Sequence, residues 1–109
     1  MFSGDKPIYL QIRDRIVARI LDQGDGALLP SVRALAAEAR VNPLTVAKAY
    51  QELQSLGLVI ARKGVGLYAA DGAAARLLAS ERSRFIEEEW PRVRTRMREL
   101  GLSLEDLTA

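Results

Sequence analysis

The sequence predicts a mainly α-helical chain with one small β-hairpin and a separate helical tail. Apolar residues recur at helical spacing in three segments before Gly57, and two short apolar runs then flank a glycine-containing turn. Beyond Asp71 the composition is strongly helical. With 109 residues, the chain can form one small core with an appended element, but not two ordinary domains.

The first predicted helix runs from about Pro7 to Leu21, and a loop with two glycines follows it. The second begins after the N-cap residue Ser31 and ends near Ala39. Each helix has one apolar face, so both are expected to pack on a common core. The apolar stripe of the first helix consists of Ile8, Ile12, Ile16, Val17 and Ile20.

The third predicted helix opens with VNPLTVAKAY and extends to about Leu56, before Gly57. Asn42 is expected to cap it, and Pro43 takes the first helical position, where its missing N–H costs nothing. At about 100° per residue, one face is apolar and the other largely polar. The apolar face contains Val46, Ala49, Tyr50, Leu53 and Leu56, and the opposite face contains Leu44, Lys48, Gln51 and Ser55.

The hairpin is predicted from Leu58 to about Ala70, around the turn RKGVG. Three helices and a hairpin, with a tight turn between the second and third helices, describe a winged helix-turn-helix domain over residues 1–70. Over residues 6–70 there are nine Lys or Arg against five Asp or Glu, whereas residues 71–109 carry a net charge of −1. This basic excess suits contact with a polyanion.

Residues 71–109 form the predicted tail, with one helix from Ala73 to Glu89 and a break or kink at Trp90-Pro91. A further helix reaches Leu100, and Ser103 with Asp106 predicts a capping box and a last short turn. The apolar set of this tail is too large for a lone helix and predicts an interface with a second copy of the chain, although packing on the head is the alternative. The set is Leu77, Leu78, Phe85, Ile86, Trp90, Val93, Met97 and Leu100.

The absence of histidine and cysteine weighs against an enzyme, a metal site and disulfides, and no cofactor is expected. Glu87, Glu88 and Glu89 point in different directions around a helix, so a solvated face is the expected interpretation. No signal peptide and no membrane-spanning segment are visible, and a cytoplasmic location is expected.

Several motifs resemble the DNA-binding domain of the GntR family of bacterial transcription regulators. They are PIYLQIRDRIVARIL, LPSVRALAAEARVNPLTVAKAYQELQSLGLV and RKGVG, and the tail RFIEEEWPRVRTRMRELGLSLEDL resembles that of the YtrA-like subfamily. The resemblance implies a homodimeric repressor or regulator that binds a palindromic double-stranded DNA operator and dimerises through its tail. It also implies that Arg33, the start of the third helix and the wing contact DNA. The expected contacts are Arg33, Asn42, Pro43, Leu44, Thr45, Ala47, Lys48, Arg62, Lys63, Gly64, Val65 and Gly66, and the position of Gln51 adds it to this set.

The chain departs from the family pattern at two places that bear on the fold. Arg40 stands in the turn where the family usually has glycine, and the loop before Leu29 is about two residues shorter, which leaves a small strand there open. Three other functions also stay open: the head of an aminotransferase-fused regulator, a winged-helix protein-interaction module, and a regulator that senses a small molecule between its tail helices. For Arg33, an ion pair with Glu38 is the alternative to DNA contact.

Overall fold

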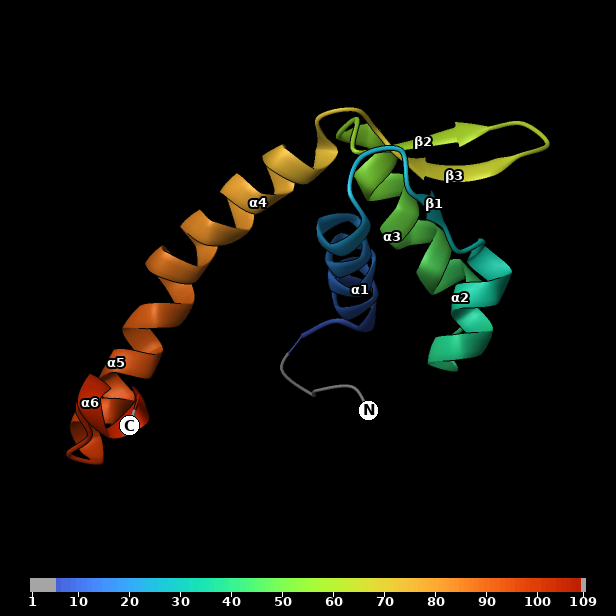
Figure 1. The fold of residues 1–109 in the computed structure, drawn as a ribbon. Coiled ribbons are helices and arrows are strands. Elements are labelled where there is room, and N and C mark those ends of the chain that lie inside the picture. The colour runs from blue at the N-terminus through green and yellow to red at the C-terminus, as the bar shows by residue number, and fades with distance from the viewer. Residues whose placement is uncertain (1–5, 109) are drawn as a thin grey trace. The chain divides into compact units, whose positions relative to one another are not determined.

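The computed structural model describes residues 6–108, and it confirms a mainly helical chain with a small sheet (Figure 1). By its internal contacts the chain divides into two compact units, the first ending at Leu77 and the second beginning at Leu78. The elements are α1 (Ile8–Gln23), β1 (Leu28–Leu29), α2 (Val32–Ala39), α3 (Pro43–Ser55), β2 (Val59–Arg62), β3 (Gly66–Ala69), α4 (Ala73–Arg84), the π-helical turn η1 (Phe85–Glu89), α5 (Trp90–Glu99) and α6 (Leu104–Thr108).

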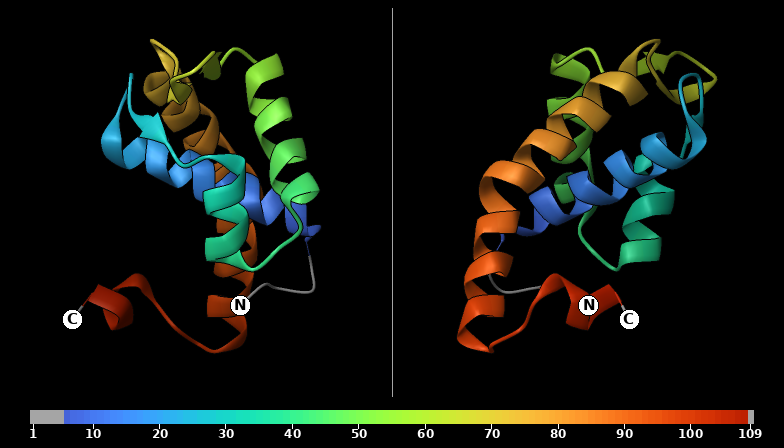
Figure 2. Two further views of the ribbon diagram at one scale, coloured as in Figure 1. Left: turned by 90° about the vertical axis from the view of Figure 1, so that its right-hand side faces the viewer. Right: turned by 60° about the vertical axis from the view of Figure 1, so that its left-hand side comes forward.

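In the first unit, α3 packs against both α1 and α2, and Figure 2 shows these three helices from two further directions. The apolar faces predicted for α1 and α3 are buried except at one end of each. Ile8 is 48% exposed because it is the first residue of α1, and Leu56 is 49% exposed because it follows the last residue of α3. The buried members are Ile12, Ile16, Val17, Ile20, Val46, Ala49, Tyr50 and Leu53.

Polar contacts also hold α1 to the other two helices. Arg13 pairs with Glu52 of α3 at 2.9 Å, and Arg19 pairs with Glu38 of α2 at 3.2 Å. Each pair is partly exposed, so each contributes little to stability by itself. The two ion pairs mainly fix where charged groups lie. They engage two of the three arginines of α1 and the acidic residue of each of α2 and α3.

The sheet has three antiparallel strands in the order β1-β3-β2. The hairpin pairs Val59 with Ala69 and Arg62 with Gly66, as the sequence predicts for this segment. The short strand that the sequence leaves open is present, since Leu28 of β1 pairs with Tyr68. This pairing attaches the loop after α1 to the hairpin.

Asp25, in the loop between α1 and β1, caps the N-terminus of α4 from a distant point in the chain. Its carboxylate accepts hydrogen bonds from the backbone N–H groups of Gly72 at 2.7 Å and Ala74 at 2.9 Å. The bonds from Ala74 and then Gly72 lower the pKa of Asp25, because they stabilise its charged form. The start of α4 is therefore fixed by the first unit.

Leu77 does not belong to the exposed surface of the tail, where the sequence analysis places it. Its side chain is 6% exposed and lies in the core cluster of the first unit, together with Ala73 of the same helix. The first turn of α4 thus packs on the winged-helix core. For Leu77, therefore, the structure shows packing on the head, the alternative to a dimer interface.

Pro91 interrupts the α-helical hydrogen bonding without ending the helix. The sequence predicts a break or kink at Trp90-Pro91, but α4, η1 and α5 follow one another directly, and the irregularity is the π-helical turn before the proline. At the end of the chain, the predicted capping box is confirmed. The Asp106 carboxylate accepts hydrogen bonds from the Ser103 backbone N–H at 2.7 Å and from its hydroxyl at 3.0 Å, and both lower the pKa of Asp106.

Among residues 6–108, no helix is both long enough and apolar enough to cross a lipid bilayer.

Candidate nucleic-acid interface

Both helices of the helix-turn-helix begin at side-chain caps that the sequence predicts. The Ser31 hydroxyl accepts a hydrogen bond from the Ala34 N–H at 3.0 Å, and the Asn42 side-chain oxygen accepts one from the Leu44 N–H at 2.8 Å. Pro43 occupies the first turn of α3, as predicted. In α3 the N–H groups of the first turn are used within the fold, because Pro43 has none and the Thr45 N–H donates to the Asn42 carbonyl at 2.9 Å. The helix dipole still favours an anion near this end.

The first two turns of α3 present short side chains and one cation to solvent. Asn42, Pro43 and Leu44 are exposed, and Leu44 is 77% exposed, which is high for a leucine without a partner. Thr45 and Ala47 are half-buried. Lys48 and Gln51 are exposed, so they lie on the helix face opposite the core, as the sequence predicts. Because these side chains are short, this face of α3 is narrow enough to enter a major groove, which is about 12 Å wide.

Lys48 is held above an aromatic ring of α1. Its ammonium nitrogen lies 3.9 Å from the centroid of the Tyr9 ring, a favourable cation–π distance. Tyr9 was not among the residues expected at the interface, because the contact joins two helices that sequence periodicity treats separately. The only signal in the sequence is that Tyr9 is an aromatic residue off the apolar stripe of α1.

The turn between α2 and α3 adopts a left-handed conformation at Arg40. Its φ of 58° is positive, and no other non-glycine residue in the described part of the chain has a positive φ. This is the position where glycine is usual in the family, so the backbone conformation is kept at some steric cost. The arginine is exposed at the end of α2, in the turn that leads to α3, and it adds a cation that is not among the expected DNA contacts.

Arg33 is exposed on the first turn of α2 and makes no ion pair with any residue between Lys6 and Thr108. The alternative partner, Glu38, is instead bonded to Arg19 through both carboxylate oxygens at 3.2 Å. The ion pair between Arg33 and Glu38 is therefore absent from the structure. The Arg33 guanidinium stays available to an external anion.

The wing is the turn of the β2–β3 hairpin. The Val65 N–H donates to the Arg62 carbonyl at 3.0 Å, which closes the turn, and Val65 itself is 62% exposed. Gly64 and Gly66 have φ values of 76° and 137°, which side-chain-bearing residues rarely adopt. Arg62 lies over the Tyr68 ring, 5.6 Å from its centroid, so one cation of the wing is oriented by the sheet.

Among residues 6–70, every cation except Arg15 falls into one of two groups. Arg13, Arg19 and Lys6, which lie on or beside α1, are neutralised by carboxylates within the fold. In contrast, the basic residues of the helix-turn-helix and the wing form no ion pair within the described range. These are Arg33, Arg40, Lys48, Arg62 and Lys63. The uncompensated positive charge is thus concentrated on the residues expected to contact DNA and on Arg40.

In the second unit, most of the predicted dimerisation residues are exposed. Leu78, Phe85, Ile86, Val93 and Leu100 are between 43% and 60% exposed, and Trp90 is half-buried. Met97 is buried to 9% exposure, although it stood in the same predicted set.

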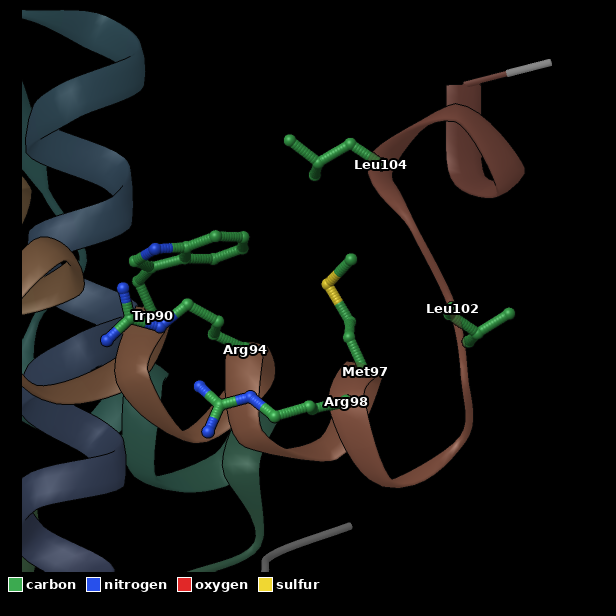
Figure 3. Close-up of a pocket in the computed structure, with 6 residues that line it drawn as sticks. All are labelled: Trp90, Arg94, Met97, Arg98, Leu102 and Leu104. Carbon is green, nitrogen blue, oxygen red and sulfur yellow. The ribbon is translucent and has the colours of Figure 1, made fainter.

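Met97 is covered because the chain after α5 turns back along it. A cavity of about 320 Å³ lies there, lined by Trp90, Arg94, Met97, Arg98, Leu102 and Leu104. Figure 3 shows the Met97 thioether and the Leu104 side chain directed toward the space beside the Trp90 ring, while Arg94 and Arg98 run together away from it.

Comparison with known proteins identifies the family. Residues 5–68 match the family model described as "Bacterial regulatory proteins, gntR family". Two Bacillus subtilis proteins match nearly the whole chain. The uncharacterized HTH-type transcriptional regulator YhcF is 36% identical over 97% of this chain and 88% of its own length, and the HTH-type transcriptional repressor YtrA is 34% identical over 93% and 78%.

Solved structures agree with the sequence relatives. A GntR family transcriptional regulator from Listeria monocytogenes superposes with a TM-score of 0.70 at 30% identity, over 97% of this chain and 93% of that one. The DNA-binding domain of AraR, solved in complex with the operator ORX1, superposes with a TM-score of 0.55 at 26% identity, over 64% of this chain and 93% of that domain. The capped helix-turn-helix, the glycine-bearing wing and these similarities lead to one conclusion: the chain belongs to the GntR family, with the YtrA-like regulators, and is a DNA-binding transcription regulator.

Proposed function

We propose that this protein acts as a homodimeric repressor that binds a palindromic operator. The observation that carries the proposal is the concentration of unpaired cations around the start of α3 and on the wing. Phosphate contacts by such groups supply much of the affinity of DNA-binding proteins and position them on the duplex. The proposal includes no catalytic step, and it places the protein in the cytoplasm, where it meets its operator.

In the proposed complex, the N-terminal turns of α3 enter the major groove. Arg33 and Lys63 bind phosphates, while Lys48 reaches a base edge or a phosphate after leaving the Tyr9 ring. The exposed Leu44 side chain gives an apolar surface for a thymine methyl group. Gly64 and Gly66 let the wing backbone approach a minor groove closely.

The homodimer is supported by the second unit of the chain. Leu78, Phe85, Ile86, Val93 and Leu100 are exposed together on one short segment, more apolar surface than a free helix of this size usually presents. A second copy that covers this segment would supply the twofold symmetry that a palindromic operator requires. Each winged helix then occupies one half-site.

The proposal is tested by footprinting on the DNA upstream of the gene that encodes the protein, at low and at moderate salt. Wild-type protein is expected to protect one palindromic site, with an affinity that falls steeply as the salt concentration rises. Lys48→Ala and Arg33→Ala are expected to weaken protection, and each should reduce the salt slope by about one unit if it removes one phosphate contact. Arg15→Ala, on α1, is the control and should change binding little.

A wild-type protein that protects no defined site at low salt would contradict the proposal. A protein-interaction module is the outcome favoured if Lys48→Ala leaves the biological activity intact. The head of an aminotransferase-fused regulator is less favoured, because the similarity to YhcF and YtrA continues through the tail.

A small-molecule effector is the second candidate function, and the cavity beside Trp90 favours it. Its volume of about 320 Å³ lies in the range of small-molecule sites, and the apolar side chains of Trp90, Met97 and Leu104 face it. Because Trp90 is the only tryptophan, its fluorescence reports on this cavity directly. Saturable quenching by a small apolar compound, coupled to a change in operator affinity, is the expected result for a sensor, and quenching without such a change contradicts sensing.

A further inference from the structure

The turn between α2 and α3 holds Arg40 in a backbone conformation that residues with a side chain disfavour. Its φ of 58° and ψ of 47° lie in the left-handed region, which glycine enters at the least cost. The turn uses this conformation to end α2, because the Arg40 and Val41 N–H groups both donate to the Ala36 carbonyl, the latter at 3.0 Å. An arginine at this position therefore bears a steric cost that a glycine would not.

The side chain of Arg40 does little within the described part of the chain to offset this cost. It is exposed, so it buries little apolar surface, and it forms no ion pair with a residue between Lys6 and Thr108. Glu38, two residues earlier, is bonded to Arg19 through both of its carboxylate oxygens. The negative end of the α2 dipole favours a cation here, which leaves that weak effect as the internal role of the guanidinium. A strained residue of this kind is a candidate for a contact outside the fold.

Arg40 lies on the same flank of α2 as Arg33. The Arg40 N–H bonds to the carbonyl four residues earlier, so its Cα continues the helical path of α2. Seven residues separate the two arginines, so their Cα atoms lie about 10 Å apart along the helix axis and within about 20° of each other around it. Ala37 is exposed between them on this flank. Glu38, which binds Arg19 of α1, lies about 140° around the helix from Arg33, so the flank with the arginines is turned away from α1.

We propose that Arg40 binds a phosphate of the operator and forms, together with Arg33, a two-point clamp on the DNA backbone along one flank of α2. This inference rests on the operator binding proposed above, and it adds a contact that the glycine usual at this position cannot make. Phosphate is the partner because a guanidinium can donate two parallel hydrogen bonds to it. The short side chain of Ala37 lets the backbone approach between the two arginines. Arg40 also stands two residues before Asn42, where the helix proposed to enter the major groove begins.

Operator binding by three variants of the full chain, measured as a function of salt concentration, tests the clamp. Arg40→Gly keeps the turn, because glycine adopts the left-handed conformation, and removes the guanidinium. Its operator affinity at moderate salt is expected to fall at least about fivefold, and its salt slope by about one unit for each half-site. Arg40→Lys keeps the charge and should keep the wild-type slope. Arg33→Ala combined with Arg40→Gly should lose about two units for each half-site, because the two arginines bind different phosphates.

Arg15→Ala is the control for the loss of one positive charge, and its salt slope should equal that of wild type. An unrelated DNA duplex gives a second comparison. Because every sequence carries phosphates, Arg40→Gly should weaken binding to this duplex by the same factor as binding to the operator. If only operator binding weakens, Arg40 reads a base, and the phosphate contact is overturned.

Urea unfolding separates a DNA contact from a structural role. Arg40→Gly is expected to unfold at a urea concentration no lower than wild type, because relief of backbone strain opposes the loss of a cation at the helix end. A lower unfolding midpoint with an unchanged salt slope would assign Arg40 to the helix dipole and overturn the clamp. A wild-type slope in Arg40→Gly, while Arg33→Ala loses one unit for each half-site, also overturns the clamp but leaves operator binding standing. If wild type binds no operator, both proposals fail.

Discussion

Tyr50 shows how one buried side chain fixes α3, the helix proposed to enter the major groove. It lies in the middle of α3, is 1% exposed, and donates its hydroxyl hydrogen bond to the Pro30 carbonyl at 2.5 Å. Burial raises the pKa of Tyr50 to about 12, with the charge of Arg19 acting in the opposite direction. The residue thus joins α3 to the segment that leads into α2.

Replacing Tyr50 with Phe should change both stability and its dependence on pH. Near pH 7 the free energy of unfolding is expected to fall by ~1 kcal/mol, because the Pro30 carbonyl loses its partner. The folded-state pKa lies above the unfolded value of 10.0, so the contribution of the protonated hydroxyl is complete below pH 10 and is lost as the pH rises toward 12. Wild type should therefore lose ~2 kcal/mol more than Tyr50→Phe across this interval.

Urea unfolding of both proteins at pH 8, 10 and 11.5 measures this difference. Tyr9 and Tyr68 are present in both, so their titration cancels. Parallel declines in stability with pH would show that Tyr50 ionises as easily in the folded state as in the unfolded chain.

At the scale of elements, the start of α3 combines a structural role with a proposed binding role at one residue. Asn42 caps the helix through its side-chain oxygen and is also exposed where DNA is expected. A carboxylate can replace the amide oxygen as a cap acceptor, whereas a methyl group cannot. The two roles can therefore be separated by substitution.

Asn42→Ala is expected to lower the free energy of unfolding by ~1 kcal/mol, because the Leu44 N–H loses its acceptor. Asn42→Asp should keep the stability of wild type but weaken operator binding at least about tenfold, because it places a negative charge against phosphates. Ser31→Ala, which removes the cap of α2, is the control for cap loss outside the groove-facing helix. Chemical denaturation and a mobility-shift titration measure the two effects. An Asn42→Asp protein that binds the operator as wild type does would contradict the placement of this helix end.

At the scale of the whole molecule, two adjacent leucines separate folding of the head from assembly of the proposed dimer. Leu77 is 6% exposed in the core of the first unit, whereas Leu78 is 50% exposed at the start of the second unit. They have the same chemistry and neighbouring positions on α4. Any difference between their alanine variants therefore reports the environment and not the residue type.

Leu77→Ala is expected to lower the free energy of unfolding by ~2–5 kcal/mol, the usual cost of such a cavity in a core, and to leave the dimer dissociation constant of folded protein unchanged. Leu78→Ala should do the reverse, with little effect on the monomer and about tenfold weaker dimerisation. Thermal unfolding at a concentration below dimerisation and sedimentation at higher concentration measure the pair. Equal effects of the two variants on dimerisation would contradict the assignment of Leu78 to the interface.

Local chemistry explains which parts of this structure could be predicted from the sequence. The caps at Ser31, Asn42 and Ser103 were predicted because each depends on residues within three positions of it. Ile8 and Leu56 belong to the predicted apolar stripes of α1 and α3, but both are exposed. Periodicity gives the direction of a side chain but not where the core ends.

The features that sequence analysis missed depend on contacts between distant segments. The Lys48–Tyr9 contact and the burial of Leu77 both require the packing of helices that are far apart in sequence. A two-residue strand such as β1 is too short for a pattern and exists only because β3 is beside it. Pro91 indicates an irregular helix, but a proline is the only local sign of both a π-helical turn and a break, so the sequence does not distinguish them.

The cap that Asp25 places on α4 has a consequence for the order of assembly. The two hydrogen bonds that start the helix come from a loop whose shape depends on α1 and on the pairing of β1 with β3. A chain whose head has not folded lacks this acceptor, and its α4 frays at the N-terminus. Since Leu78 follows directly, only a folded head can present a complete surface to a partner. In the proposed homodimer, chains would therefore join through their tails only after their heads have folded.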